Sequence, residues 1–265
     1  MPLKPVAGLA AEPLNIVETL RQRIMAGLAT LIDPRFTTFI AGDASPPTFA
    51  AYQQFVAGQD AFWHGDFNEA ISRFGWAAEL DSSFLSAPVW LVTARGSIFD
   101  CAPADSIGRA LAPRRERLSR IDRLLLDREL AWCHADWDEV LRLARQSAEA
   151  RPNSTKEQFL VGFYAAFDNR PREAATALSH LSARHDLGWM PDSAKMYYWA
   201  YLTGAYHSLG DYNRELAASE RLAHDFPRHL APVYYEARAL AGVGRASEAL
   251  DRLDVGAHLE SEPSL

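Results

Sequence analysis

The sequence has few cysteines and no long hydrophobic run. Only two cysteines occur among the 265 residues, Cys101 and Cys133, and they do not form a CxxC spacing. Two isolated thiols in a chain of this length do not predict a disulfide framework, and they are compatible with a reducing compartment. No stretch reaches the ~18 apolar residues of a membrane-spanning helix, and the first residues lack a charged segment followed by an apolar core. We therefore expect a cytoplasmic protein, unless the chain is part of a larger, membrane-tethered one.

An excess of positive charge is also missing. The chain has 27 Lys and Arg residues against 34 Asp and Glu residues, which gives a formal net charge of −7. Proteins that bind nucleic acid usually carry a basic patch or stripe, so this balance argues against a nucleic-acid partner. The hydrophobic fraction of 48% excludes wholesale disorder.

Motifs of catalysis and metal binding are lacking. The sequence has no HExxH and no GxSxG, and Gly242 and Gly244 lie between two expected helices, without the strand that a dinucleotide fingerprint requires. Two histidine pairs are spaced five residues apart, which does not place both rings on one helical face: His180 with His185, and His224 with His229. We therefore predict no metal, no cofactor and no catalytic residues, with an enzyme on a helical scaffold as an alternative.

A helical hairpin is predicted between Tyr52 and Leu80. Residues 54–63 contain no proline, Gly65-Asp66 supplies a stop signal, and a pattern with apolar residues three and four apart resumes at Phe67. Gly58 would let the backbones of two antiparallel helices approach closely, while Phe74 fills the space beside it.

This hairpin resembles the tetratricopeptide repeat (TPR), a 34-residue helical hairpin. Counting Ala51 as place 1, six characteristic places are filled by Gly58, Gly65, Phe67, Ala70, Phe74 and Ala77. Place 32 departs, with Ser82 where the family has proline. Further units begin at Leu85, where the match is weak, and at Ile121, Thr155, Met196 and Leu230. The unit at Met196 departs from the family at places 20 and 24, which hold Glu215 and Ser219.

The resemblance implies an all-α, right-handed superhelical solenoid of five to six helix-turn-helix repeats. In front of them, Leu14 to Ile32 forms an amphipathic pattern with apolar residues four apart: Ile16, Leu20, Ile24, Leu28 and Ile32. We expect this helix to cap the array by packing its apolar stripe on the first repeat. Residues 1–47 are then a flexible lead-in and the capping helix, 48–259 the repeat array, and 260–265 a frayed tail.

Two stretches break the repeat register. The unit from Leu85 to about Arg120 is expected to contain a helix ending near Phe99 and a second one starting near Asp105, with a break at Pro113. An excess of seven residues between Gly188 and Lys195 predicts a longer loop.

Seven arginines gather within twenty residues. They alternate with acidic residues at helical spacings, which favours a salt-bridged outer face, and an anionic contact surface is the alternative. The arginines are Arg109, Arg114, Arg115, Arg117, Arg120, Arg123 and Arg128.

Aromatic residues carry the functional prediction. In the TPR family, places 2, 5, 9, 12 and 13 of each first helix line the concave side of the superhelix. The resemblance therefore implies a protein-interaction scaffold that captures a partner segment in a groove, or else these side chains are core. The predicted groove residues are Tyr52, Phe55, Gln59, Trp63, Leu125, Glu129, Phe159, Phe163, Phe167, Tyr197 and Tyr234. The partner is a protein or peptide of open identity, and the oligomeric state is also open.

A second, looser resemblance is to repeat regions of bacterial signalling proteins that carry a kinase or winged-helix domain upstream. It implies a role in bacterial signalling or regulation and leaves a ligand-sensing region as an alternative function. The family's pattern of lysines and asparagines that clamps chaperone tails is absent here, so that ligand is not carried over.

Overall fold

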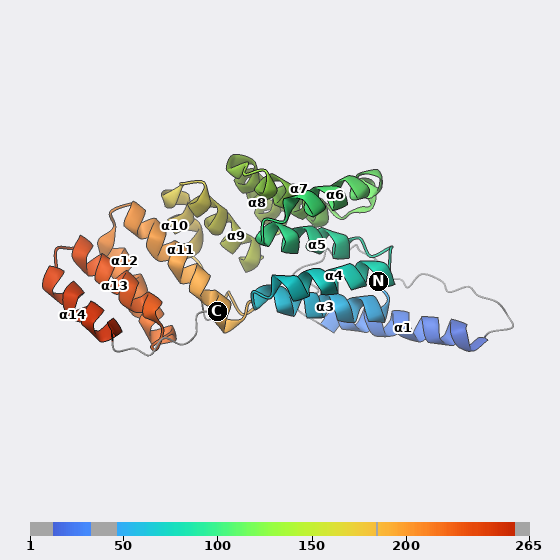
Figure 1. Cartoon of the computed structure of the whole chain (residues 1–265), viewed down its shortest axis with the longest axis horizontal. Coiled ribbons are helices and arrows are strands. Elements are labelled where there is room, and N and C mark those ends of the chain that lie inside the picture. The colour runs from blue at the N-terminus through green and yellow to red at the C-terminus, as the bar shows by residue number, and fades with distance from the viewer. Residues whose placement is uncertain (1–12, 33–46, 184, 258–265) are drawn as a thin grey trace. The chain divides into compact units, whose positions relative to one another are not determined.

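The computed structural model describes residues 13–32, 47–183 and 185–257, and every regular element in these ranges is a helix (Figure 1). The all-α prediction is confirmed. The predicted lead-in at residues 1–12 and the tail at residues 260–265 lie outside the described residues. The chain divides into two compact units, Met1–Ala150 (unit 1) and Arg151–Leu265 (unit 2).

Unit 1 is a run of helical hairpins preceded by one helix. Its helices are α1 Pro13–Ile32, α3 Phe49–Trp63, α4 Phe67–Leu80, α5 Ser86–Ser97, α6 Cys101–Leu111, α7 Arg120–Cys133 and α8 Trp137–Ala150. Helices α3 and α4, α5 and α6, and α7 and α8 pack as hairpins, and α4 and α7 both pack on α5. The first hairpin therefore lies where the repeat pattern places it.

Close backbone approach joins the two helices of the first hairpin. A Cβ added at Gly58 would lie 2.8 Å from Cδ1 of Phe74, and Ala70 and Phe74 are both fully buried. The N-termini are capped by side chains: Thr48 Oγ1 accepts from the Ala51 N–H, and Asp66 accepts from the Glu69 N–H. The predicted crossing of small residues is confirmed.

The second hairpin differs from its prediction in where α6 begins. The helix starts at Cys101 rather than near Asp105, because Pro103 is tolerated in a first turn, where its missing N–H would have no partner. It ends at Leu111 and is followed by the 3₁₀ helix η1, Ala112–Arg117, which contains Pro113. The predicted break at this proline is confirmed.

A disulfide joins Cys101 to Cys133, with the two Cα atoms 5.4 Å apart. The expectation of two isolated thiols was wrong. The residues are 32 positions apart, close to one repeat length, so each lies at the turn of its own hairpin, and the turns of neighbouring hairpins adjoin. Disulfides persist mainly in oxidising environments, so the bond counts against the expected reducing compartment.

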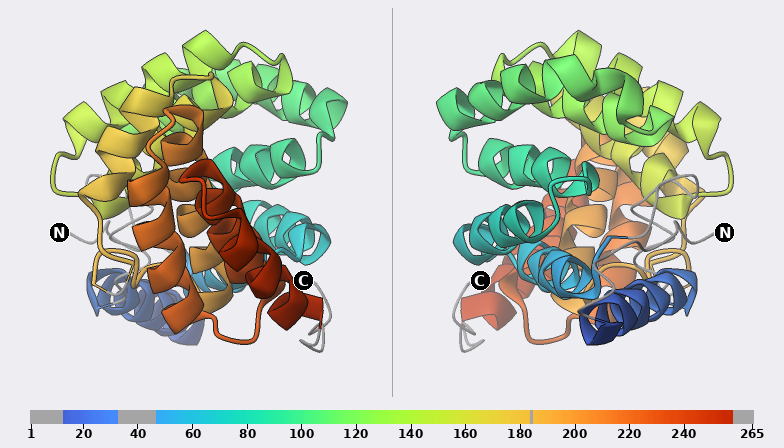
Figure 2. Two further views of the ribbon diagram at one scale, coloured as in Figure 1. Left: turned by 90° about the vertical axis from the view of Figure 1, so that its left-hand side faces the viewer. Right: turned by 90° about the vertical axis from the view of Figure 1, so that its right-hand side faces the viewer.

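Helix α1 forms where it was predicted, but its apolar stripe does not pack on the first repeat. It lies beside α3 (Figures 1 and 2), and Ala26 and Gly27 are the buried residues among those of α1 whose burial the structure describes. Leu20, Ile24 and Leu28 are 42%, 41% and 50% exposed. The small residues allow close approach to α3 and turn the large side chains away from it, which corrects the expected orientation of the helix.

Unit 2 contains three further hairpins. Its helices are α9 Thr155–Phe167, α10 Pro171–Ser179, α11 Lys195–Ser208, α12 Tyr212–Asp225, α13 Leu230–Gly242 and α14 Ala246–Ala257, with the short 3₁₀ helix η2, Asp192–Ala194, before α11. Helices α11 to α14 stack in chain order (Figure 2). The predicted long loop lies between α10 and α11, and its Leu187 and Met190 are buried.

One residue with positive φ closes the turn of every hairpin. These residues are Gly65, Phe99, Ala135, Asn169, Gly210 and Gly244. They occupy the same place in successive repeats, one residue after the C-cap of the first helix, where a left-handed residue ends the helix. The regular recurrence supports one repeat register through both units.

Candidate functional site

The first helices of the three unit 2 hairpins carry a row of aromatic side chains, called here the aromatic row: Phe163, Phe167, Tyr197, Tyr201, Tyr234 and Tyr235. On α9 and α11, the Tyr201 ring lies edge-on to Phe163 with the ring centroids 4.7 Å apart, and Phe167 is 5.9 Å from Tyr201. On α13, the rings of Tyr234 and Tyr235 are 5.2 Å apart. His207 of α11 and Arg238 of α13 both contact Glu215 of α12, which connects α13 to α11.

These side chains are unusually exposed for residues of their size. Tyr197 is 59% exposed, Tyr234 56% and Phe167 43%, while Phe163, Tyr201 and Tyr235 are partly exposed. Exposed aromatic surface that is contiguous rather than scattered marks an interaction site. The row therefore offers apolar area to another molecule.

Two tyrosines of the row, Tyr201 and Tyr235, have hydroxyls whose pKa is raised by burial. Burial raises the pKa of Tyr201 to about 12, and Tyr197 and Tyr235 contribute in the same direction. Burial also raises the pKa of Tyr235, against a smaller lowering by Arg238. Each of these two hydroxyls therefore keeps its proton at neutral pH and can donate a hydrogen bond.

Gly204 leaves open space on α11 within this row. An added Cβ at this glycine would meet no atom within 4 Å, although the residue lies inside a helix and carries no positive φ. By contrast, a Cβ at Gly162 on α9 would lie 2.5 Å from Cγ of Leu178. Gly162 is thus required by packing inside its hairpin, whereas Gly204 is not.

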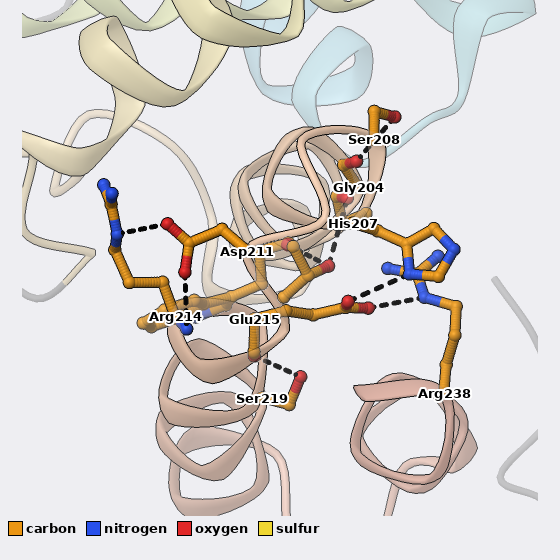
Figure 3. A network of polar contacts seen from close by, with 11 residues as sticks. Gly204, His207, Ser208, Asp211, Arg214, Glu215, Ser219 and Arg238 are labelled. Atoms are coloured by element: carbon orange, nitrogen blue, oxygen red, sulfur yellow. Dashed lines mark hydrogen bonds and ion pairs between the residues drawn. The ribbon is translucent and has the colours of Figure 1, made fainter. Parts of the chain in front are cut away.

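A buried charge network lies beside the row (Figure 3). Glu215 on α12 has no exposed surface; its carboxylate accepts from Nδ1 of His207 at 2.9 Å and from Nε of Arg238 at 2.6 Å. Because the carboxylate accepts this hydrogen bond, the proton is assigned to Nδ1 of His207. The guanidinium of Arg238 also lies over the ring of Tyr235, 5.1 Å from its centroid. The network fixes α13 to the hairpin of α11 and α12.

The predicted groove residues of unit 1 are mostly buried. Phe55 and Gln59 are 1% exposed, Glu129 5%, Leu125 6% and Tyr52 9%, while Trp63 is partly exposed. Phe55 packs edge-on to Phe84 and Trp90, with centroid distances of 5.0 Å and 6.3 Å. In unit 1 these places therefore supply core packing rather than a surface.

Glu129 forms a buried ion pair with Arg128, the residue before it. Its carboxylate accepts from Nη2 of Arg128 at 2.9 Å, and both side chains are buried. A buried pair of this kind is locked in place, because removing one partner leaves an uncompensated charge.

In unit 2 the predicted residues are divided. Phe159 is only 4% exposed and lies beneath the aromatic row. Its ring stacks on that of Phe163, with the ring centroids 6.1 Å apart. Phe163, Phe167, Tyr197 and Tyr234 lie in the aromatic row. The structure therefore brings four of the predicted groove residues onto one exposed face.

Sequence reasoning missed two members of the row, Tyr201 and Tyr235, and the neighbouring Gly204 and Arg238. Tyr201 and Tyr235 both occupy place 6 of their repeats, which is not one of the family's concave places. Gly204 and Arg238 occupy place 9 of their repeats, the same place as Phe163, and applying that rule to every repeat would have found them. Glu215 stands at place 20, where the family has alanine. Because a buried carboxylate needs a cationic partner, this departure could have indicated that a basic residue such as Arg238 lies next to it.

The arginine-rich segment is largely paired within unit 1. Arg115 donates to both carboxylate oxygens of Asp127 at 2.7 and 2.6 Å, and Arg114 donates to the backbone oxygen of Ser82. Arg123 lies 3.8 Å from Glu116. These contacts favour the salt-bridged face over an anion-binding surface.

Within the described residues, no group of three or more His, Cys, Asp or Glu side chains is placed to hold a metal ion. Over the same part of the chain, no helix has the length and hydrophobicity to cross a membrane.

Similarity to known proteins is visible in the fold. No protein-family model matches the sequence, and a comparison with curated proteins finds no match. Among solved structures, a tetratricopeptide repeat protein of Parabacteroides merdae is 12% identical with a TM-score of 0.51, and the match covers 81% of each chain. A thermophilic TPR protein of Thermus thermophilus is 17% identical with a TM-score of 0.53, covering 72% of this chain and 100% of that one.

The chain is thus a helical-repeat protein with the TPR fold, as its repeat pattern predicted. At these identities the likeness shows the fold alone.

Proposed function

We propose that the aromatic row captures an apolar segment of a protein partner, and that the chain acts by binding rather than by catalysis. The observation that carries this proposal is the exposed row of aromatic rings with open space at Gly204 in its middle. Aromatic rings supply large contact area and lose little side-chain entropy on binding, so they dominate the energy of protein interfaces.

The open space at Gly204 comes at a cost to the helix. A glycine inside a helix is about 0.5–1 kcal/mol less favourable than alanine, and no neighbouring atom requires it here. The missing side chain lets a partner's backbone or an apolar side chain approach α11 between the flanking rings. Close approach of this kind is a common reason for a glycine in a regular element.

The chemistry of the row points to an apolar partner segment. Its six side chains are all phenylalanine or tyrosine, and the nearby Arg238 and Glu215 form an ion pair with each other. The lysines and asparagines of the family's carboxylate clamp are not in the row. We therefore expect recognition by apolar side chains, with weak dependence on salt concentration.

The ligand-sensing alternative fits the row less well. Small-molecule sites are usually concave and bury most of the ligand. The row instead exposes about half of Tyr197 and of Tyr234, which suits a larger partner surface. A setting in bacterial signalling or regulation remains part of this proposal and depends on the looser sequence resemblance alone.

A peptide-display library provides the test. Peptides selected on the wild-type chain should share spaced apolar residues, and their affinity, measured by fluorescence polarisation, should fall at least tenfold on Gly204→Trp. Gly75 on α4 is a matched control, because a Cβ there also meets no atom within 4 Å. Gly75→Trp should bind the peptides as the wild type does. Equal binding by Gly204→Trp, or no selection at all, would reject the proposal.

Phe163→Asp is a second test of the same surface. Phe163 is partly exposed, so the carboxylate can reach water, and the fold should remain within about 1 kcal/mol of wild type while the selected peptides are no longer bound. If the ring is a core residue, the same change buries an unpaired charge and costs several kcal/mol. Urea unfolding followed by circular dichroism distinguishes the two results.

A further inference from the structure

Helix α1 has an apolar face that the described residues of unit 1 leave uncovered. This face, called here the α1 stripe, is formed by residues three or four positions apart, with exposures from 39% to 80%: Leu14, Val17, Leu20, Ile24, Met25, Leu28 and Ile32. Seven large apolar side chains on one helical face form a patch rather than scattered exposure. A patch of this kind on a folded protein marks a contact with another molecule.

The attachment of α1 to the rest of unit 1 is slight. Among the side chains of α1 that the structure describes, the buried ones belong to Ala26 and Gly27, which have little or no side chain, and Ile16 is partly buried. One ion pair interrupts the stripe, because Arg21 lies on the same face of the helix: its Nε and Nη2 each donate to the Glu18 carboxylate at 2.7 Å. Among the described side chains of α1, the small ones therefore lie toward α3 and most of the large apolar ones are exposed.

We propose that the α1 stripe pairs with the α1 stripe of a second copy of this chain, the two helices running antiparallel about a two-fold axis. A two-fold interface must be self-complementary, so that residue i of one copy meets residue j of the other and the reverse. About a midpoint between Gln22 and Arg23, Ile24 of one copy mirrors Arg21 of the other, whose methylene stem can cover the apolar side chain while its guanidinium stays with Glu18. Val17 mirrors Leu28, and Leu20 mirrors Met25. Leu14 falls beside Ile32, so these layers of the pair are apolar.

The area is adequate for a dimer. Side chains of this size at these exposures present on the order of 100 Å² each, so the stripe offers roughly 700 Å² per copy, close to the ~800 Å² that each partner contributes to a standard interface.

Two other surfaces fit less well. A membrane-surface helix usually carries many Lys or Arg residues on its polar face and Trp or Phe at its apolar edge. Within the described part of α1 there is no lysine and no aromatic residue, and Arg21 is paired with Glu18. Helix α14 also exposes apolar side chains, but Leu250, Leu253 and Val255 form a much shorter stripe.

The oligomeric state tests the proposal. Sedimentation velocity and light scattering on the full chain should give twice the 29.5 kDa chain mass. Leu20→Asp with Ile24→Asp should weaken the dimer at least roughly a hundredfold, with unchanged circular dichroism, because both side chains are exposed in the single chain. Leu250→Asp with Leu253→Asp is the matched control and should leave the dimer intact.

Cysteine cross-linking tests the antiparallel register even if the aspartate variant unfolds. With Val17→Cys and Leu28→Cys together, mild oxidation should link two chains on a non-reducing gel. Val17→Cys alone should not link, because the two copies of residue 17 would lie ~16 Å apart along the helices, beyond the ~7 Å Cα separation that a disulfide spans.

A monomer throughout the concentration series, a dimer lost with the α14 variant instead, or linkage by Val17→Cys alone would each overturn the proposal. So would a monomer that co-sediments with anionic phospholipid vesicles through the α1 stripe. The aromatic row lies in unit 2, so a failure here leaves the proposed peptide capture untouched.

Discussion

Glycines inside the helices of this chain serve different purposes, and the space around each one distinguishes them. At Gly58 and Gly162 a Cβ would collide with Phe74 and Leu178 of the paired helix. At Gly204 it would meet nothing. The sequence marks Gly58 and Gly162 through the repeat register, whereas the purpose of Gly204 follows only from the three-dimensional surroundings.

Substituting these glycines by alanine should therefore change stability in opposite directions. Gly204→Ala should stabilise the chain by about 0.5–1 kcal/mol, because alanine is the better helix former and the space is free. Gly162→Ala should destabilise it by about 1–3 kcal/mol, because the new methyl group overpacks against Leu178. Urea unfolding curves of the two variants measure both values. A loss of stability in Gly204→Ala would contradict the assigned open space.

Glu215 shows how a departure from the repeat pattern is compensated by neighbouring residues. The family has alanine at this place, and a carboxylate there is fully buried between α11 and α13. His207 and Arg238 both donate to it, so its charge is paired. The sequence shows that Glu215 departs from the repeat pattern, but it does not show which residues pair with it, because Arg238 lies 23 positions further along the chain.

Removing Arg238 should cost more than removing both members of the ion pair. Arg238→Met leaves a buried carboxylate with only His207 and should destabilise the chain by about 3–5 kcal/mol. Glu215→Ala combined with Arg238→Met restores the family residue and should recover a large part of that loss. Thermal unfolding of the single and double variants provides the comparison. A double variant that loses as much stability as the two single variants together would show that the pair is not coupled.

At the scale of elements, the hairpin turns were the most predictable feature and the helix surfaces the least. Turn positions follow from short-range signals such as Gly65-Asp66 and Gly210-Asp211. Yet Phe99 and Ala135 adopt the same left-handed conformation without the expected residue type, with φ of 56° and 54°. In these two turns the packing of the hairpin overrides the local preference, which costs about 1–2 kcal/mol for a residue with a side chain.

Glycine at position 135 should relieve this cost. Ala135→Gly removes the Cβ that disfavours a positive φ and should stabilise the chain by up to about 1 kcal/mol. Gly210→Ala, with a native φ of 68°, is the reverse experiment and should destabilise by a similar amount. Chemical denaturation of both variants gives the sign. Destabilisation by Ala135→Gly would mean that the methyl group contributes more than the strain costs.

Helix surfaces were harder to assign because amphipathic spacing identifies an apolar face but not what covers it. The same family places hold core residues in unit 1, such as Phe55 and Leu125, and exposed residues in unit 2, such as Tyr197 and Tyr234. For α1 the spacing predicted the helix correctly to one residue, but the small residues Ala26 and Gly27 decided which side meets α3. Contact between neighbouring helices, and not periodicity, separates core from surface here.

At the scale of the whole molecule, repeats in tandem explain why the fold was predictable without a matching family model. Each hairpin repeats the register, so several weak matches reinforce one another, whereas no single helix would identify the fold. The disulfide was not predictable by the same reasoning. Its residues lie at the turns of different hairpins, and only the stacking of α5, α6 and α7 brings them together.

Reduction of the Cys101–Cys133 bond should weaken unit 1 and spare unit 2. The bond lies within unit 1 and closes a segment of 32 positions; cross-links of this span contribute about 3–4 kcal/mol in the chain-entropy description. In a repeat protein each hairpin contacts chiefly its neighbours, so the loss should remain local. Hydrogen exchange with and without reductant should show reduced protection in α6 and α7 and unchanged protection in α12 to α14.

The double variant Cys101→Ser with Cys133→Ser is the control for this experiment. Its exchange pattern should match that of the reduced wild type, and reductant should then change nothing. Equal loss of protection in both units would show that the array unfolds as a single cooperative body rather than hairpin by hairpin. An unchanged pattern after verified reduction would show that the packing of α6 on α7 holds unit 1 together without the bond.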